Sequence, residues 1–195
     1  MSYLISLIIS YFLGSIPFGL IVTKLFKMGD IRKVGSGNIG ATNVMRVGGL
    51  RIAGLVWILD MLKAIVAVLI GRYVGGETLA VWCGFVAIVG HCFPVWLKWH
   101  GGKGISCLFG ILLAVNPLLF IICGIEWLIV ALGTGFSSAG AIVAFCLMPI
   151  LGFVLSFNTG IGFLAIALLC LWRHRENLIR LISSRESKIE WKWKK

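Results

Sequence analysis

The chain has 195 residues, is 59% hydrophobic and has a mean hydropathy of +1.03, which together exclude an ordinary soluble globular domain. Its formal net charge is +11, from 18 Lys and Arg against only 7 Asp and Glu. A composition this apolar and this basic is typical of a membrane protein whose charges gather in the loops between its spans.

Seven stretches are apolar enough for membrane helices, each of which needs about 20 mostly apolar residues. They cover residues 2–22, 52–71, 78–97, 104–116, 117–134, 138–155 and 158–172. The segment 104–116 is short for a span, so we expect either a tilted helix or a half-helix that begins inside a polar cavity. Asn116-Pro117 predicts a turn after it. The sequence therefore predicts an all-α, polytopic bundle of seven transmembrane helices that forms a single integral membrane domain over residues 1–195.

The basic residues alternate between the two sides of these spans. They gather around residues 24–51, at Lys98 and Lys103, and in a tail over residues 173–195, whereas the opposite side carries only Arg72. The positive-inside rule then places the N-terminus outside and the C-terminus in the cytoplasm. The first span lacks a basic leader and a small-residue cleavage site, so we expect it to be retained.

The tail is also expected to contact anionic membrane lipids. Trp191 and Trp193 lie among its basic residues, and each basic residue near a headgroup surface contributes about 1 kcal/mol. Plain control of topology is the alternative for this segment. The six cysteines have no metal-binding or paired spacing, so they predict apolar packing and no disulfide framework.

A first glycine-rich polar segment lies between the first two spans. It comprises Gly35, Ser36, Gly37, Asn38, Gly40, Thr42, Asn43 and Arg46. Its glycines permit positive φ angles and a close approach of a ligand to the backbone, and Arg46 can grip phosphate oxygens with two hydrogen bonds. A helix that begins near Thr42 would add its dipole. These features predict an anion site, and a flexible connecting loop is the alternative.

A second polar segment precedes residues 104–116 and comprises Gly101, Gly102, Lys103 and Gly104. A lysine at a helix start is unfavourable for the helix dipole, which makes sense if Lys103 faces a bound anion. Control of topology by Lys98 and Lys103 is the alternative. His91 and His100, which flank this region, are candidates either for the site or for structural roles at the membrane interface.

A third polar segment follows the last span, and a short loop lies near it in the predicted topology. His174, Glu176 and Asn177 can fold back toward a ligand, or they can form an exposed helix end with a Glu176–Arg180 ion pair. In the short loop, Ser137 and Ser138 either bind a ligand or cap the following helix.

Ionisable residues inside spans are costly and usually face the protein interior. Asp60 and Lys63 stand three residues apart in the second span and predict a buried ion pair, whereas Glu126 has no evident partner.

Several chemistries are excluded by the absence of their motifs. No His is followed five residues later by Asp, as in acyl-CoA-dependent glycerolipid acyltransferases, and no paired aspartates suggest the Mg²⁺ site of alcohol phosphatidyltransferases. No G-x-S-x-G nucleophile motif and no Walker loop are present. The few acidic residues are scattered, so the sequence predicts no metal, no cofactor and no nucleic-acid partner.

The three polar segments together resemble the motifs of the bacterial acyl-phosphate:glycerol-3-phosphate acyltransferase family, known as PlsY. The first motif is resembled by Ser36-Gly37-Asn38-Ile39-Gly40-Ala41-Thr42-Asn43 with Arg46. The second is resembled by Gly90-His91 with Gly101-Gly102-Lys103-Gly104. The third is resembled by His174-Arg175-Glu176-Asn177 with Arg180-Leu181 and Glu186. Two departures are visible. Residues 136–140 replace a Val-Ser-Leu-x-Ser pattern, so only Ser137 carries over, and Ser184 stands where the family usually has glycine.

The resemblance implies an enzyme of the bacterial inner membrane, with a cytoplasmic active site, that moves an acyl group from acyl-phosphate to the 1-hydroxyl of glycerol 3-phosphate. The products would be lysophosphatidic acid and phosphate, in the first acylation of phospholipid synthesis, with functional coupling to an enzyme that produces acyl-phosphate. The implied catalytic residues are Ser36, Arg46, Lys103 and Asn177. The implied substrate-binding residues are Gly37, Asn38, Gly40, Thr42, Asn43, His91, Gly101, Gly102, Gly104, Ser137, His174 and Glu176.

Two other classes of protein remain alternatives. A transporter of a small phosphate ester would also need an anion site, although transporters often bind substrate near the membrane midplane between internal repeats. A membrane scaffold would use its basic loops for topology alone.

Overall fold

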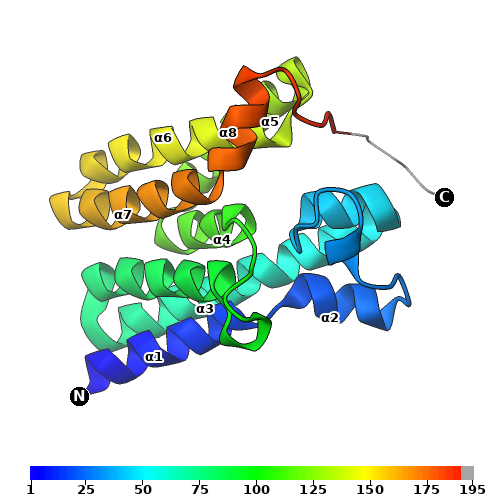
Figure 1. Cartoon of the computed structure of the whole chain (residues 1–195). Coiled ribbons are helices and arrows are strands. Elements are labelled where there is room, and N and C mark those ends of the chain that lie inside the picture. The colour runs from blue at the N-terminus through cyan, green and yellow to red at the C-terminus, as the bar shows by residue number, and fades with distance from the viewer. Residues whose placement is uncertain (190–195) are drawn as a thin grey trace.

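The structure is a computed structural model that describes residues 1–189, and every described element is helical (Figure 1). The α-helices are α1 (Ser2–Ser15), α2 (Phe18–Leu25), α3 (Ala41–Cys92), α4 (Ile105–Val115), α5 (Pro117–Thr134), α6 (Ser137–Leu155), α7 (Phe157–Arg173) and α8 (Arg175–Ile182). Two 3₁₀ turns, Ile31–Lys33 and Val95–Leu97, lie in the connections. The Trp191 and Trp193 expected to contact lipid lie outside the described residues.

The first expected span is broken at Pro17. Proline lacks a backbone N–H and disfavours a helical conformation in the residue before it. Ile16 is accordingly extended, with φ −63° and ψ 118°, and helices α1 and α2 lie on either side of it.

The second and third expected spans form the single continuous element α3, which reverses direction inside its bounds. Gly75 and Gly76 have non-helical backbone angles, and Gly76 has φ 72°. A Cβ atom added at Gly71 would lie 2.7 Å from the Leu79 carbonyl oxygen. In a straight helix, residues eight positions apart are separated by about 12 Å along the axis. The two halves of α3 are therefore packed antiparallel against each other.

Within residues 1–189, four helices are long and apolar enough to cross a membrane, or five if the bent pair α7 and α8 counts as one span. That count takes the reversing α3 as one helix and leaves out α4, which has only 11 residues. With α3 divided at Gly75–Gly76, and with α1–α2 and α7–α8 each counted as one span, residues 1–189 give seven helical segments in the expected order. The expected seven-helix, all-α bundle therefore fits the architecture.

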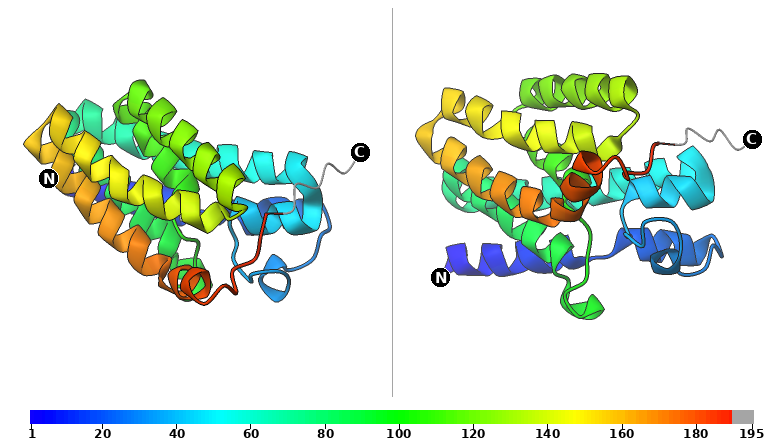
Figure 2. Two further views of the ribbon diagram at one scale, coloured as in Figure 1. Left: turned by 90° about the horizontal axis from the view of Figure 1, so that it is seen from above. Right: turned by 45° about the horizontal axis from the view of Figure 1, so that its top comes forward.

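The bundle is closed by two apolar clusters. The larger one joins α3, α4, α6 and α7 through residues such as Ile88, Leu108, Phe145 and Phe163, all fully buried. The smaller one includes Ile31 and Val44 and lies under the first polar loop. Figure 2 shows from two further sides that the N-terminus lies at the opposite end of the bundle from this loop.

The Lys63 ammonium joins three separate segments inside the bundle. It lies 2.7 Å from the Asp60 carboxylate, donates to the Ile16 carbonyl at 2.8 Å and lies 3.0 Å from His91 Nδ1. The expected Asp60–Lys63 ion pair is therefore confirmed, and its ammonium also satisfies the carbonyl at the α1–α2 break. Glu126, in contrast, has no hydrogen-bond partner among the described side chains and backbone groups.

We predict that Lys63→Met destabilises the protein by about 3–5 kcal/mol, because it leaves the buried Asp60 carboxylate without its cation. Thermal unfolding in detergent measures the loss. Arg72→Met is the matched control, because Arg72 pairs with Glu77 on the exposed surface, where an ion pair contributes about 0–1 kcal/mol. Equal melting temperatures for the two variants would contradict this role of Lys63.

Candidate active site

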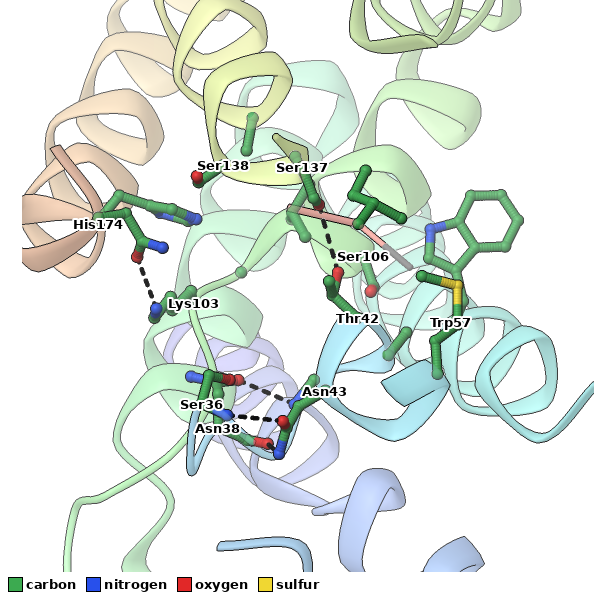
Figure 3. A pocket seen from close by; sticks show the side chains of 18 of the residues that line it. Ser36, Asn38, Thr42, Asn43, Trp57, Lys103, Ser106, Ser137, Ser138 and His174 are labelled. Atoms are coloured by element: carbon green, nitrogen blue, oxygen red, sulfur yellow. Dashed lines mark hydrogen bonds between the residues drawn. The ribbon is translucent and has the colours of Figure 1, made fainter. Parts of the chain in front are cut away.

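One cavity of about 910 Å³ opens between α3, α4, α5, α6 and the start of α8, and all three predicted polar segments reach it. Figure 3 shows that Ser36, Asn38, Thr42, Lys103, Ser137 and His174 approach it from different elements. The lining is polar where these segments meet and apolar toward Trp57, Phe109 and Phe120. The cavity thus has a polar, basic part suited to an anion and an apolar part, called here the apolar arm.

The first polar loop is held by the side chain of Asn43, which is 1% exposed. Its amide nitrogen lies 3.0, 3.1 and 2.8 Å from the carbonyl oxygens of Ile31, Val34 and Asn38. Its amide oxygen accepts from the Ser36 N–H at 2.9 Å. Four backbone groups therefore depend on one side chain. Asn43, a predicted substrate-binding residue, lines the cavity, and its amide is occupied by the loop.

Two of the loop glycines use their backbone N–H groups for hydrogen bonds within the loop and do not offer them to a ligand. The Gly37 N–H donates to the Val34 carbonyl, and the Gly40 N–H donates to the Asn38 side chain. The Ser36 N–H is also bonded, to the Asn43 side chain. The start of α3 still offers the N–H groups of Ala41 and Thr42 to a ligand, because the first N–H groups of a helix have no acceptor within it. The expected anion site therefore includes the start of this helix.

The side chains around that helix start complete a polar corner. The Thr42 hydroxyl lies 3.3 Å from the Ser137 hydroxyl, which brings the first turns of α3 and α6 together. Arg46 lies one turn further along α3 and lines the cavity, and the ion pairs of residues 1–189 do not include it. Both helix N-termini and the guanidinium therefore favour an anion here.

The second polar loop is fixed from two sides. The N–H groups of Gly101 and Gly102 donate to the Cys92 and His91 carbonyls, each at 3.0 Å. The Arg173 guanidinium donates to the Gly102 and Gly101 carbonyls at 3.1 and 3.0 Å. Gly101 and Gly102 do not line the cavity, whereas Lys103 and Gly104 do. The two glycines therefore position Lys103 and do not reach the cavity themselves.

Gly102 also packs directly on the His91 ring, and no side chain would fit at this glycine. Because His91 Nδ1 accepts from the Lys63 ammonium, its Nε2 carries the ring proton. His91 lines the cavity but is 5% exposed. It connects the buried Lys63 cluster to the loop that carries Lys103.

Lys103 begins a chain of polar contacts that includes the third motif. Its ammonium donates to Asn177 Oδ1 at 2.6 Å, and Asn177 Nδ2 donates to the Glu186 carboxylate at 2.7 Å. The same carboxylate accepts from the Ser138 hydroxyl at 2.9 Å and pairs with Arg180 at 2.7 Å. Glu186 thereby sets the orientation of Asn177 and, through it, of Lys103.

Burial and charge tune this network. Burial lowers the pKa of Lys103, helped by Arg180 and opposed by Glu186 and Glu176. Burial by itself would raise the pKa of Glu186, but the hydrogen bonds from Arg180, Asn177 and Ser138 outweigh it and hold that pKa below its usual value. Glu186 is therefore an anion that balances the surrounding cations.

His174 faces the same cavity as a neutral ring. Burial lowers its pKa to about 4, against the opposing effect of the Cys170 carbonyl. A carbonyl can only accept a hydrogen bond, so the 2.8 Å contact fixes the proton on Nδ1. The Nε2 atom of His174 is then an acceptor.

One of the two alternatives for the third segment does not occur in the structure. The Glu176–Arg180 ion pair expected from helical spacing does not form, because Arg180 pairs with Glu186. Glu176 instead lies 4.0 Å from Arg175 and is largely exposed, although it lines the cavity. His100 is exposed, and its ring bonds the Lys98 carbonyl.

The cavity also holds side chains that were not predicted as site residues. Arg173, Arg180 and Glu186 all line it. Ser138, which the sequence left open between ligand binding and helix capping, lines it too. Glu186 belonged to the motif resemblance, but the sequence gives no sign that a residue nine positions after Asn177 returns to it. Among residues 1–189, no group of three or more His, Cys, Asp or Glu side chains could hold a metal ion. The absence of a metal from the functional protein stays a prediction.

The family model described as glycerol-3-phosphate acyltransferase matches residues 4–184. The chain belongs to this family. It is 44% identical over 183 residues to a glycerol-3-phosphate acyltransferase of Rhizobium etli, covering 93% of this chain and 89% of that one. It is 45% identical over 183 residues to one of Roseobacter denitrificans, covering 93% and 92%. The family resemblance inferred from the three motifs is therefore confirmed.

Solved structures agree with the sequence relationship. The chain is 36% identical to PlsY (YgiH), an integral membrane glycerol 3-phosphate acyltransferase, in a crystal structure of its glycerol 3-phosphate form. The TM-score is 0.92, and the match covers 97% of this chain and 96% of that one. The lysophosphatidic acid form gives a TM-score of 0.91 at 34% identity, covering 98% and 97%. The chain is thus a multi-pass membrane protein of this fold, and the roles of its site residues stay predictions.

We predict that Asn43→Ala lowers kcat/KM by about 10²-fold, because the loop over residues 31–40 loses its common partner and misplacement by about 1 Å costs that much. Asn43→Asp should be as defective, since a carboxylate cannot donate to three carbonyls. Asn158→Ala is the matched control, because Asn158 is exposed on α7. Acyltransferase assays measure the activity of each variant, and circular dichroism shows whether it is folded. Unchanged activity in a folded Asn43→Ala variant would contradict this role of Asn43.

Proposed function

We propose that the protein transfers a fatty acyl group from acyl-phosphate to the 1-hydroxyl of glycerol 3-phosphate, giving lysophosphatidic acid and phosphate. This would be the first acylation of bacterial phospholipid synthesis. The observation that carries the proposal is that Arg46 and Lys103 line one cavity that continues into an apolar arm. A phosphate headgroup and a fatty chain both match that cavity, and PlsY has been solved in forms with glycerol 3-phosphate and lysophosphatidic acid.

Two phosphate positions are needed, because both substrates carry a phosphate. One is the corner formed by Thr42, Arg46 and Ser137, and the other is the surroundings of Lys103 and Asn177. Ser36 also lines the cavity. We assign catalytic roles to Ser36, Arg46, Lys103 and Asn177, and binding roles to the other predicted residues that line the cavity. Which phosphate occupies which position stays open.

The reaction requires one bond to form and one to break. The C1 hydroxyl oxygen of glycerol 3-phosphate attacks the acyl carbonyl carbon, and the bond from that carbon to the phosphate oxygen breaks. The phosphate leaves with the bonding electrons. The cations Arg46 and Lys103 stabilise negative charge on the carbonyl oxygen and on the leaving phosphate. Holding the two substrates together supplies up to about 7–11 kcal/mol of the barrier.

The hydroxyl proton goes to a substrate phosphate in this proposal. The site contains many donors, whereas its one strongly bound carboxylate, Glu186, already accepts from Asn177, Ser138 and Arg180. His174 Nε2 is an acceptor near the site, and we assign it to orienting the glycerol hydroxyl. A phosphate dianion is a sufficient base because its second pKa is about 6.

We also propose that the polar end of the bundle faces the cytoplasm of a bacterial inner membrane and that residues 1–195 form one domain. The basic residues gather at this polar end, and α1 begins at the opposite end, which supports an outside N-terminus (Figure 1). Anionic lipids and an enzyme that produces acyl-phosphate are the proposed partners. Labelling of single-cysteine variants from either side of the membrane tests this orientation.

We predict that Arg46→Ala and Lys103→Ala each lower kcat/KM by about 10²–10³-fold, because each removes a cation that stabilises developing charge. The assay uses purified protein in lipid, palmitoyl phosphate and glycerol 3-phosphate, and follows release of phosphate and lysophosphatidic acid. Palmitoyl-CoA is offered in parallel and should give no product.

Two matched variants control for loss of charge alone. Arg51→Ala and Lys98→Ala each remove an exposed basic residue that does not line the cavity, and both should keep their activity. A folded wild-type protein that binds glycerol 3-phosphate but forms no product from palmitoyl phosphate would refute the proposal. Uptake of glycerol 3-phosphate into vesicles by such a protein would favour transport.

The pH dependence distinguishes a histidine base from a phosphate base. Because the pKa of His174 is lowered to about 4, the ring is neutral above that pH and becomes charged only as the pH falls through about 4. We predict that the acidic limb of kcat/KM lies near the second pKa of phosphate, at about 6. His174→Gln should lower the rate and leave that limb in place. Disappearance of the limb in this variant would show that His174 is the base.

A further inference from the structure

The apolar arm of the cavity is lined by three helices. Along α3 the lining changes from Thr42 and Arg46 to Trp57, and along α4 it changes from Gly104 to Phe109. Helix α5 contributes Phe120 to the same arm. All three helices thus place an aromatic residue at the end of the arm away from Lys103.

These aromatic rings pack against one another as a wall. The ring centroids of Trp57 and Phe109 are 6.3 Å apart, and those of Phe109 and Phe120 are 5.9 Å apart with planes at 85°. Phe109 is only 4% exposed. Aromatic pairs favour such tilted and edge-to-face arrangements, which hold the rings in a defined position.

Two glycines lie one helical turn from this wall and leave space beside it. Gly54 precedes Trp57 on α3, Gly124 follows Phe120 on α5, and both line the cavity. A Cβ at Gly54 would meet nothing within 4 Å, and one at Gly124 would meet only Phe109 Cε1, at 3.9 Å. Both positions can therefore accept a side chain that projects into the arm.

Helix packing does not explain these two glycines. At Gly140, in contrast, an added Cβ would lie 2.7 Å from the Trp127 carbonyl, so glycine there permits close helix contact. A glycine inside a helix is less favourable than alanine. What Gly54 and Gly124 provide instead is empty volume next to the aromatic wall.

We propose that Gly54 and Gly124 determine the length of the fatty acyl chain that the cavity accepts. The inference rests on the proposed acyl transfer and specifies its donor as a long-chain acyl-phosphate whose methyl end lies between these glycines. A side chain at either position fills the space that the last methylenes occupy. Each methylene excluded from an apolar site costs about tenfold or more in kcat/KM.

The test compares Gly54→Leu and Gly124→Leu with the wild-type protein on decanoyl, lauroyl, myristoyl and palmitoyl phosphate. We expect kcat/KM for palmitoyl phosphate to fall by at least about tenfold, while that for decanoyl phosphate changes by less than about twofold. The KM for glycerol 3-phosphate should not change. Gly54→Ala and Gly124→Ala should shift the preference in the same direction by a smaller amount.

Gly133→Leu is the matched control. Gly133 lies on α5, a Cβ there would also meet nothing within 4 Å, and the residue does not line the cavity. Its donor preference should equal that of the wild type. Folded alanine and leucine variants that keep the wild-type preference, or that lose activity equally with every donor, would overturn the inference. Failure of the wild-type protein with all four donors would refute the proposed acyl transfer instead.

Discussion

The bundle depends on the way it satisfies one buried cation, the Lys63 ammonium. A charge within a membrane span is costly unless it has partners, and this one has Asp60 on its own helix, the Ile16 carbonyl and the His91 ring. Those partners come from the break between α1 and α2 and from both antiparallel halves of α3. The same His91 packs on Gly102. The cost of burying the charge is thus offset by contacts that also define where the loop carrying Lys103 begins.

The active end of the bundle follows a second constraint, which is that irregular backbone at a membrane surface needs partners for its polar groups. Asn43 satisfies the loop over residues 31–40, and Arg173 satisfies the carbonyls of Gly101 and Gly102. With the loops fixed by these two side chains, Arg46 and Lys103 are not needed to hold the backbone. Their charges are directed into the cavity, which is the condition for preorganised electrostatic catalysis.

The sequence predicted the helical bundle, the meeting of the three motifs and the Asp60–Lys63 pair, because hydropathy and glycine spacing report on local structure. It did not predict how α3 reverses, since Gly75-Gly76 is also compatible with an ordinary loop. It missed Arg173 and Glu186 as residues that hold the site together. In a sequence, a charged residue near the end of a span that sets the membrane topology cannot be told from one that belongs to a site. It also predicted that the glycines of the first polar segment let a ligand approach the backbone, whereas the N–H groups of Ser36, Gly37 and Gly40 bond within the loop.

The balance of charge at the site explains why a protein base is not required for the proposed reaction. Arg46, Lys103, Arg173 and Arg180 all line the cavity, and Glu186 is held ionised by three donors. A neutral His174 adds no charge, and a protein base that gained a proton here would place a further positive charge among the cations. A substrate phosphate that takes the proton stays anionic and stays attracted to them. In the proposed reaction, the electrostatics that would bind two phosphates therefore also favour transfer of the proton to one of them.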